Sequence, residues 1–282
     1  MSSRVLVGLD GAVLDPDAPL LFADDLAAVR GDGIFETLLV RGRRVCTLDL
    51  HLARLTTSAE AMDLPAPDLP RWRTAVAAAV KAWDSDDEGV MRMSIGRGRE
   101  SGGPPTGYVT VGPLADRVRS ARRDGVSVVT LPRGLSIEAA SSPWQLLGAK
   151  TLSYAINMAA LRYAAGLGAD DVVFVSSEGM VLEGPRSTVV AVTGQSLLTP
   201  PVEYGVLRGT TVSALFEVAS GSGYECAYAP LRPADLIVAD SVWLVSSVTL
   251  AARVRSLDGL ARAERPGDDE IRTLVDLAVE SI

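Results

Sequence analysis

The pattern of apolar and polar residues in the first part of the chain predicts short strands and two helices. From about Asp49, the expected N-cap, apolar residues recur at helical spacing, and they do so again over 71–83. The segment 97–106 combines arginines with several Gly and Pro residues, which is typical of a loop. Strands are expected around these elements at 4–14 (turning at an Asp-Gly pair), 33–40, 43–48, 89–96 and 107–114.

The pattern changes at ADRVRSARRDG (115–125), where the apolar alternation is lost. We place a domain boundary there, giving domains at 1–117 and 118–282. In the second domain we expect, among other elements, a helix over about 151–165, a strand at 180–184 and a helix from near Gly209. The mixture of strands and helices, without an internal repeat, favours an α+β two-domain enzyme over a doubly wound sheet.

Composition narrows the class of protein. The chain has 282 residues and a formal net charge of −8, so it offers no basic field for nucleic acid or an anionic membrane. We expect no membrane span, a cytoplasmic location, and free thiols at Cys46 and Cys226. His51 is the only histidine, which argues against zinc sites built on several imidazoles and weakens a Ser-His-Asp hydrolase. We expect no metal.

Lysine is scarce. Lys and Arg together number 27, but only Lys81 and Lys150 are lysines. A sheltered lysine can lose its proton and attack a carbonyl, whereas arginine stays protonated. Lys81 near the end of a helix is typical of a solvated cation. Lys150 follows the apolar segment PWQLLGA and is a candidate nucleophile, with an ordinary surface lysine as the alternative.

Three further groups of residues suggest a binding site. Glu183, between an apolar segment and a Gly-Pro turn, needs a cation, which is either Arg186 or a protonated ring nitrogen of a cofactor. Thr210, Thr211 and Ser247 offer hydroxyls for a phosphate, although Thr-Thr at a helix start is also a common cap.

Arginines supply the remaining candidates. Arg54 could bind a phosphate or carboxylate, or form a helix-surface ion pair. Arg92, Arg97 and Arg99 could line a pocket for an anionic substrate, or be solvated charges of the 97–106 loop.

Taken together, the chain resembles the class IV pyridoxal-phosphate enzymes, which include branched-chain aminotransferases, D-amino-acid aminotransferases and aminodeoxychorismate lyases. The resemblance spans nearly the whole chain and rests on four motifs in family order. These are GDGIFETLLVRGRRVCTLDLHLARL (31–55), GAKTLSYAINMAALRYAAGLGADD (148–171), VLEGPRSTVVAV (181–192) and LLTPP…GVLRGTTVSAL (197–215).

The resemblance implies a fold and roles for particular residues. The fold is that of D-amino-acid aminotransferases, with a small N-terminal α/β domain and a larger C-terminal mixed, β-barrel-like domain with helices. Lys150 binds pyridoxal 5'-phosphate covalently and Glu183 pairs with the ring nitrogen. Tyr154 approaches the cofactor phenolate, and His51 is structural. The phosphate contacts come from Arg54, Thr210, Thr211 and Ser247. A homodimer is also implied.

Within the family, the chain is most similar to the lyases. It has Thr37 after FE, where branched-chain enzymes resemble FEGIR, and its loop lacks the histidine of the Arg-x-His trap of D-amino-acid aminotransferases. The resemblance implies a 4-amino-4-deoxychorismate lyase of folate precursor synthesis, giving 4-aminobenzoate and pyruvate, with Thr37 assisting Lys150. Arg92 and Arg97 would bind the substrate carboxylates. Arg30, where relatives often have an aromatic residue, is a departure that could add another substrate contact or alter specificity. The alternatives are an aminotransferase for D-alanine or other D-amino acids, less so for branched-chain L-amino acids, and a non-catalytic scaffold.

Overall fold

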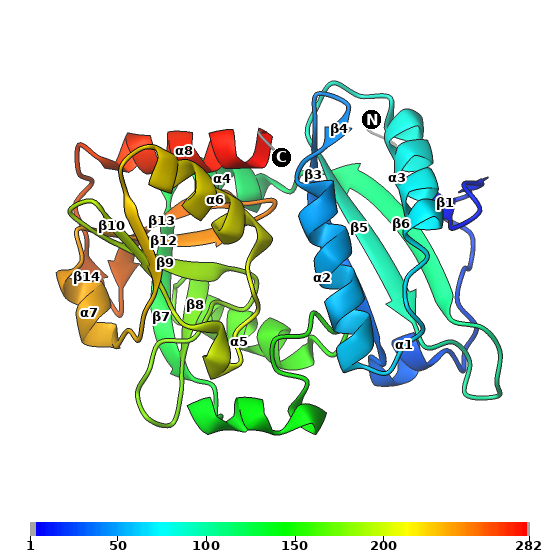
Figure 1. Ribbon diagram of the computed structural model, residues 1–282, viewed down its shortest axis with the longest axis horizontal. Coiled ribbons are helices and arrows are strands. Elements are labelled where there is room, and N and C mark those ends of the chain that lie inside the picture. The colour runs from blue at the N-terminus through cyan, green and yellow to red at the C-terminus, as the bar shows by residue number, and fades with distance from the viewer. Residues whose placement is uncertain (1–3, 281–282) are drawn as a thin grey trace. The chain divides into compact units, whose positions relative to one another are not determined.

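The computed structural model describes residues 4–280 and divides into two compact units (Figure 1). Unit 1 comprises the described residues up to Ala115 together with Ala149–Tyr154. Unit 2 comprises Asp116–Gly148 and the described residues from Ala155 onward. The division falls two residues before the predicted boundary at residue 117, and the short segment 149–154 belongs with the first unit.

Unit 1 is built on a six-stranded antiparallel sheet in the order β2-β1-β6-β5-β3-β4. Helix α2 contacts β3, while α3 contacts β1 and β6. The elements of this unit are β1 (Val5–Gly8), β2 (Val13–Leu14), α1 (Leu26–Arg30), β3 (Gly33–Arg41), β4 (Arg44–Val45), α2 (Leu48–Ala61), α3 (Leu69–Trp83), β5 (Gly89–Gly96) and β6 (Thr106–Pro113). The predicted strand at 89–96 is confirmed residue for residue as β5.

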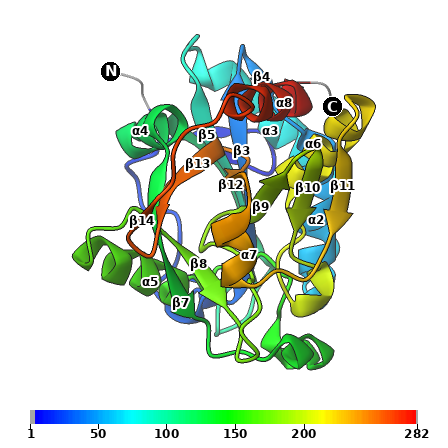
Figure 2. The same cartoon turned by 90° about the vertical axis from the view of Figure 1, so that its left-hand side faces the viewer.

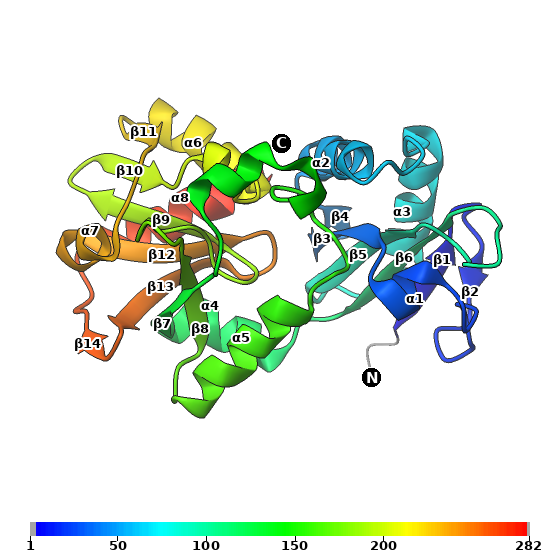
Figure 3. The same cartoon turned by 90° about the horizontal axis from the view of Figure 1, so that it is seen from below.

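Unit 2 contains an eight-stranded mixed sheet, in the order β11-β10-β9-β12-β13-β7-β8 with β14 paired to β13. Helices α6 and α8 pack together against β12 and β13 (Figure 2), and α5 lies along β7 and β8 (Figure 3). The strands are β7 (Val126–Pro132), β8 (Asp171–Val175), β9 (Thr188–Thr193), β10 (Ser196–Thr199), β11 (Glu225–Tyr228), β12 (Ser241–Ser246), β13 (Leu250–Leu257) and β14 (Leu260–Ala261). The helices are α4 (Asp116–Asp124), α5 (Ala155–Gly166), α6 (Thr210–Gly221), α7 (Pro233–Val238) and α8 (Asp268–Glu280), with short 3-10 turns η1 (Ile137–Ser141), η2 (Pro143–Gln145) and η3 (Val202–Tyr204).

The sheet of unit 2 is buried on both faces. On β8, Val173 packs into one apolar cluster, whereas Val172 and Phe174 pack into another. Since successive strand residues point to opposite faces, a strand covered on both sides reads as a continuous apolar run. The run DVVFVS in the sequence therefore corresponds to β8, which ends the sheet order but is covered on both faces.

Several predicted boundaries are wrong, each for a local reason. The helix expected from residue 151 begins at Ala155, because residues 150–152 are paired with β3. Helix α2 is capped at Thr47, and Asp49 instead forms an ion pair with Arg73. The segment 180–184 forms isolated bridges only, and the stretch 115–125, where we placed the domain boundary without assigning an element, contains helix α4.

Candidate active site

Lys150 lies in unit 1 because its neighbours pair with the start of β3. The Phe35 amide donates to the Lys150 carbonyl at 3.0 Å, and the Leu152 amide donates to the Gly33 carbonyl at 2.7 Å. On the other side, the Lys150 amide donates to Ser58 Oγ on α2 at 3.1 Å. The backbone of the candidate nucleophile is therefore held by both a strand and a helix, which fixes where its side chain starts.

The Lys150 amine lies near two aromatic rings. Its Nζ lies 4.6 Å from the centroid of the Phe35 ring and 6.0 Å from that of Tyr154. The two rings meet edge to face, with centroids 5.4 Å apart and planes at 84°. Tyr154, predicted to approach a cofactor phenolate, is thus brought beside Lys150. Its contact with a cofactor stays a prediction.

A fully buried carboxylate, Glu36, lies on the opposite face of β3 from Phe35 and Thr37. It shares the core face with Ile34 and Leu38, which are also completely buried. Sequence reasoning did not single out Glu36. The signal was present, because the alternation of IFETL places a carboxylate at a core position, where it needs charged partners.

Those partners are Arg54 and His51 of α2. Arg54 donates from Nε and Nη2 to the two Glu36 oxygens at 2.7 and 2.6 Å, and His51 Nδ1 lies 2.6 Å from Glu36 Oε2. Burial opposes ionisation, but Arg54 and His51 outweigh it and lower the pKa of Glu36 to about 2. Because an ionised carboxylate only accepts, His51 Nδ1–H is the donor. Burial also lowers the pKa of His51, which keeps the ring neutral at physiological pH.

Thr37 and Arg92 form a cross-strand pair on the opposite face of the sheet. They are directly opposed in the β3–β5 register, and Thr110 of β6 is opposed to Arg92 in turn. Opposed residues of antiparallel strands point to the same face. Arg92 is exposed, and no ion pair to it is found among residues 4–280. The predicted catalytic hydroxyl and the predicted substrate arginine are thus neighbours.

The other two predicted substrate arginines are placed differently. Arg97 donates to Asp32 Oδ2 at 2.7 Å, to the Met62 carbonyl at 2.6 Å and to the Asp63 carbonyl at 3.2 Å. These contacts tie the end of β5 to the segment after α2, and they give Arg97 a structural role. Arg30 is exposed at the last position of α1. Substrate binding by either residue stays a prediction.

In unit 2, the Glu183 carboxylate accepts a hydrogen bond from the Leu207 amide at 3.1 Å. Arg186, weighed as its structural partner, instead lies 3.6 Å from Asp171. The ion pair found for Arg186 therefore belongs to another carboxylate. Contact of Glu183 with a cofactor stays a prediction.

The three predicted phosphate hydroxyls meet in unit 2 although they are far apart in the sequence. Ser247, in the turn between β12 and β13, has its Oγ 3.2 Å from Thr210 Oγ1 and 3.3 Å from Thr211 Oγ1. Thr210 and Thr211 open α6, whose N-cap, Gly209, provides no side-chain cap. A helix N-terminus with hydroxyls and uncapped amides suits a phosphate. The chain thus offers a lysine amine, a carboxylate and a phosphate-type hydroxyl cluster, which is the donor set pyridoxal phosphate needs.

Within the described residues no group of three or more His, Cys, Asp or Glu side chains could hold a metal ion. The same residues contain no helix that is both long and apolar enough to cross a membrane.

A sequence model of the class IV aminotransferases matches residues 33–257. The chain belongs to this family. Among its relatives, a bifunctional aminodeoxychorismate lyase / D-amino acid transaminase from Mycobacterium tuberculosis is 56% identical over 98% of this chain and 99% of that protein. The predicted family is therefore confirmed.

Solved structures agree with the class IV fold. A hypothetical aminotransferase from M. tuberculosis, in a PLP-bound form, is 57% identical over 99% of both chains, with a TM-score of 0.97. A fold IV transaminase from Curtobacterium pusillum is 38% identical over 99% of this chain and 98% of that chain, with a TM-score of 0.92. The predicted α+β fold of this family is confirmed.

Proposed function

We propose that this class IV enzyme is a pyridoxal 5'-phosphate-dependent 4-amino-4-deoxychorismate lyase that also transaminates D-amino acids. The observation that carries the proposal is the 56% identity, over nearly the full length of both chains, to the mycobacterial bifunctional enzyme named for both activities. The mycobacterial aminotransferase that is 57% identical to this chain has also been solved in PLP-bound form. These comparisons bear out the predicted lyase with its aminotransferase alternative, and the predicted cofactor.

The family resemblance assigns each proposed cofactor-binding residue its role. Lys150 is the residue of covalent attachment, with Tyr154 beside it. Glu183 is proposed to face the ring nitrogen, and Thr210, Thr211 and Ser247 to bind the phosphate, with Arg54 as a further phosphate ligand. When bound, pyridoxal phosphate withdraws electrons from the bond that breaks at the amine-bearing carbon.

The chain's own groups then handle protons and charge. Lys150 is proposed to remove the proton from the amine-bearing carbon of the substrate, since a sheltered amine can be neutral and positioned. Thr37 would position the lysine or a water through its hydroxyl. Arg92, opposed to Thr37 on the same face, would bind a substrate carboxylate and so orient the substrate ring toward Lys150 and Thr37. The lyase products are 4-aminobenzoate and pyruvate.

We also propose a cytoplasmic homodimer. Helix α5 and the residue after it expose a stripe of large apolar side chains, Ile156 at 60%, Tyr163 at 60% and Leu167 at 58%. Their spacing of seven and four residues puts them on one helix face, which a second copy could cover. Cys46 and Cys226 are free thiols, as in a reducing compartment. Light scattering on the purified holoenzyme tests the dimer, and a monomer at micromolar concentration would contradict it.

A parallel assay tests the activity. Purified holoenzyme is given aminodeoxychorismate in one reaction and D-alanine with 2-oxoglutarate in another, and the products are identified. We expect 4-aminobenzoate with pyruvate in the first, and D-glutamate with pyruvate in the second. Formation of pyruvate only from D-alanine would support the aminotransferase alone, and no product from either would overturn the proposal. Lys150→Ala should abolish both reactions and borohydride trapping of the cofactor, whereas Lys81→Arg should change neither.

A further inference from the structure

One arginine of α4 reaches the turn that carries Ser247. Helix α4 holds four arginines in nine residues, within the stretch that the sequence pattern left unassigned. Arg122 donates from Nε and from Nη2 to the Val248 carbonyl, at 3.2 and 2.5 Å. Both groups are partly buried, so these charge-assisted hydrogen bonds are shielded from bulk water.

Further contacts and backbone geometry describe the turn that accepts these bonds. Between β12 and β13, the Thr249 amide donates to Ser246 Oγ at 3.3 Å. Leu250 has a φ of 60°, a left-handed conformation that a leucine adopts only when its surroundings impose it. Ser247, whose hydroxyl meets Thr210 and Thr211, directly precedes Val248. The carbonyl that Arg122 binds is therefore one residue away from the hydroxyl cluster.

We propose that Arg122 is a positioning residue for cofactor phosphate binding, acting through the Val248 carbonyl. This inference rests on the proposed function, because it takes the hydroxyl cluster as the phosphate site. By holding the turn, Arg122 keeps the Ser247 hydroxyl beside the start of α6 before the phosphate arrives. Preorganised donors bind an anion more tightly than donors that must first be ordered.

Arg123 provides a matched control on the same helix. It pairs with its neighbour Asp124 at the surface, at 2.7 and 2.8 Å, and both side chains are largely exposed. Arg123→Met therefore makes the same change of charge and helix propensity as Arg122→Met. It leaves the β12–β13 turn untouched.

The test compares two ligands that differ in the phosphate group. Apoprotein of the wild type and of the Arg122→Met, Arg122→Lys and Arg123→Met variants is titrated with pyridoxal 5'-phosphate and with pyridoxal, following the absorbance of the bound ligand. For Arg122→Met we expect about ten-fold weaker binding of pyridoxal phosphate, since hydrogen bonds from a charged donor are lost, and little change for pyridoxal. Arg122→Lys should recover part of the loss, and Arg123→Met should bind both ligands as the wild type does.

The outcomes separate this inference from the proposed function. If the wild type binds neither ligand at Lys150, the proposed function fails. Suppose that the wild type binds both ligands. If Arg122→Met then binds them as Arg123→Met does, or loses the same factor of affinity for both, the inference alone is overturned. Thermal unfolding of the apoproteins checks folding. If Arg122→Met does not fold, Arg122→Lys tests the inference instead. Its affinity for pyridoxal phosphate must then fall by more than its affinity for pyridoxal.

Discussion

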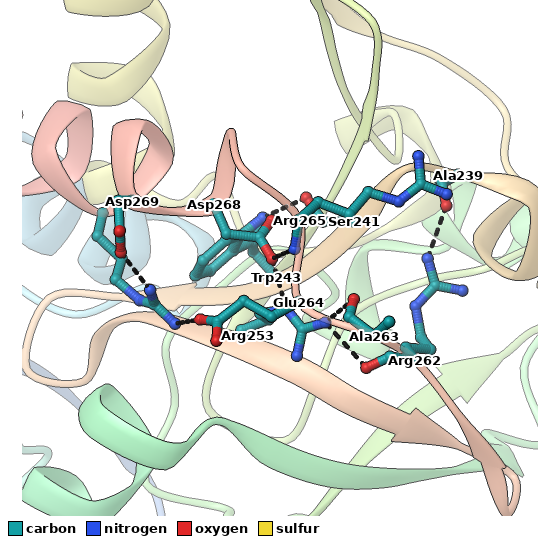
Figure 4. Close-up of polar contacts among 11 residues, drawn as sticks. Ala239, Ser241, Trp243, Arg253, Arg262, Ala263, Glu264, Arg265, Asp268 and Asp269 are labelled. Atoms are coloured by element: carbon teal, nitrogen blue, oxygen red, sulfur yellow. Dashed lines mark hydrogen bonds and ion pairs between the residues drawn. The ribbon is translucent and has the colours of Figure 1, made fainter.

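Each unit contains a buried arginine–carboxylate pair, and the two pairs have different surroundings. In unit 1, Arg54 binds Glu36 at 2.6 and 2.7 Å, and the same carboxylate accepts from His51. In unit 2, Arg253 of β13 binds Asp268 at 2.6 Å at the start of α8. Figure 4 shows this second pair among further arginines and backbone carbonyls.

The partners of each pair indicate what it does. Arg253 also donates to the carbonyls of Arg262 and Ala263, and Asp268 accepts from the Arg265 amide at 2.9 Å (Figure 4). All these contacts fasten the segment before α8 to β13. The Arg54 pair instead joins β3 to α2, and α2 also holds the Lys150 backbone through Ser58. We infer that one pair is purely structural, whereas the other serves both the fold and the site.

Breaking the unit 2 pair should have the largest effect on stability. Arg253→Met leaves the Asp268 carboxylate buried without its cation, and we expect a loss of about 3–5 kcal/mol in the free energy of unfolding. Urea unfolding measures this loss. Arg255→Met is the control, because Arg255 lies two residues along the same strand and forms a half-exposed pair with Asp170, worth about 1 kcal/mol or less. Pyridoxal phosphate affinity of the folded Arg253→Met protein should be unchanged, and a weakened affinity would contradict the structural interpretation.

Removing the Glu36 charge should cost somewhat less stability but should also affect the site. The carboxyl titrates at 4.5 in the unfolded chain and at about 2 in the fold, so its contribution is present above pH 4.5 and is lost as the pH falls toward 2. The difference corresponds to about 3 kcal/mol. Glu36→Gln should flatten the acid limb of the stability–pH curve over this window, as measured by urea unfolding at several pH values.

Glu36→Gln should also lower the affinity for pyridoxal phosphate, because Arg54 loses the partner that fixes its guanidinium. Glu88→Gln, which alters the less buried pair with Arg41 at 2.7 Å, serves as the control and should leave cofactor affinity unchanged. Wild-type affinity in Glu36→Gln would show that the unit 1 pair is as purely structural as that of unit 2.

The contrast between the pairs also shows what the sequence could predict. Strand β5 was predictable because its alternation is regular, and the roles proposed for Lys150 and Glu183 rest on motifs whose order the family fixes. The start of α5 was not predictable from helical spacing, since residues 150–152 pair with a strand more than a hundred positions earlier. Arg253 was not singled out because only the fold brings Asp268 to it, whereas the alternation around Glu36 held a signal that sequence reasoning did not use.

Arg92, on the sheet face opposite Glu36, extends the comparison to the substrate. Arg92 is exposed and opposed to Thr37, so Arg92→Met should leave stability within about 0.5 kcal/mol of the wild type. If it binds a substrate carboxylate, KM for aminodeoxychorismate should rise about 10- to 100-fold. Steady-state kinetics measure this, and Arg92→Lys should recover part of the loss. An unchanged KM would remove Arg92 from the substrate site.

Replacing Arg97 should give the smallest effect. In contrast to Arg92, the change should appear in stability and not in KM. Its pair with Asp32 and its bonds to two carbonyls lie near the surface, so Arg97→Met should cost about 1 kcal/mol of stability and leave KM unchanged. Arg99→Met is a matched control, since Arg99 pairs with Asp24 in the same loop at similar exposure. A rise in KM for Arg97→Met, beyond that of the control, would restore the substrate role that the family resemblance implies. Arg97 would then act like the Arg54 pair of unit 1, in which one arginine serves both the fold and the site.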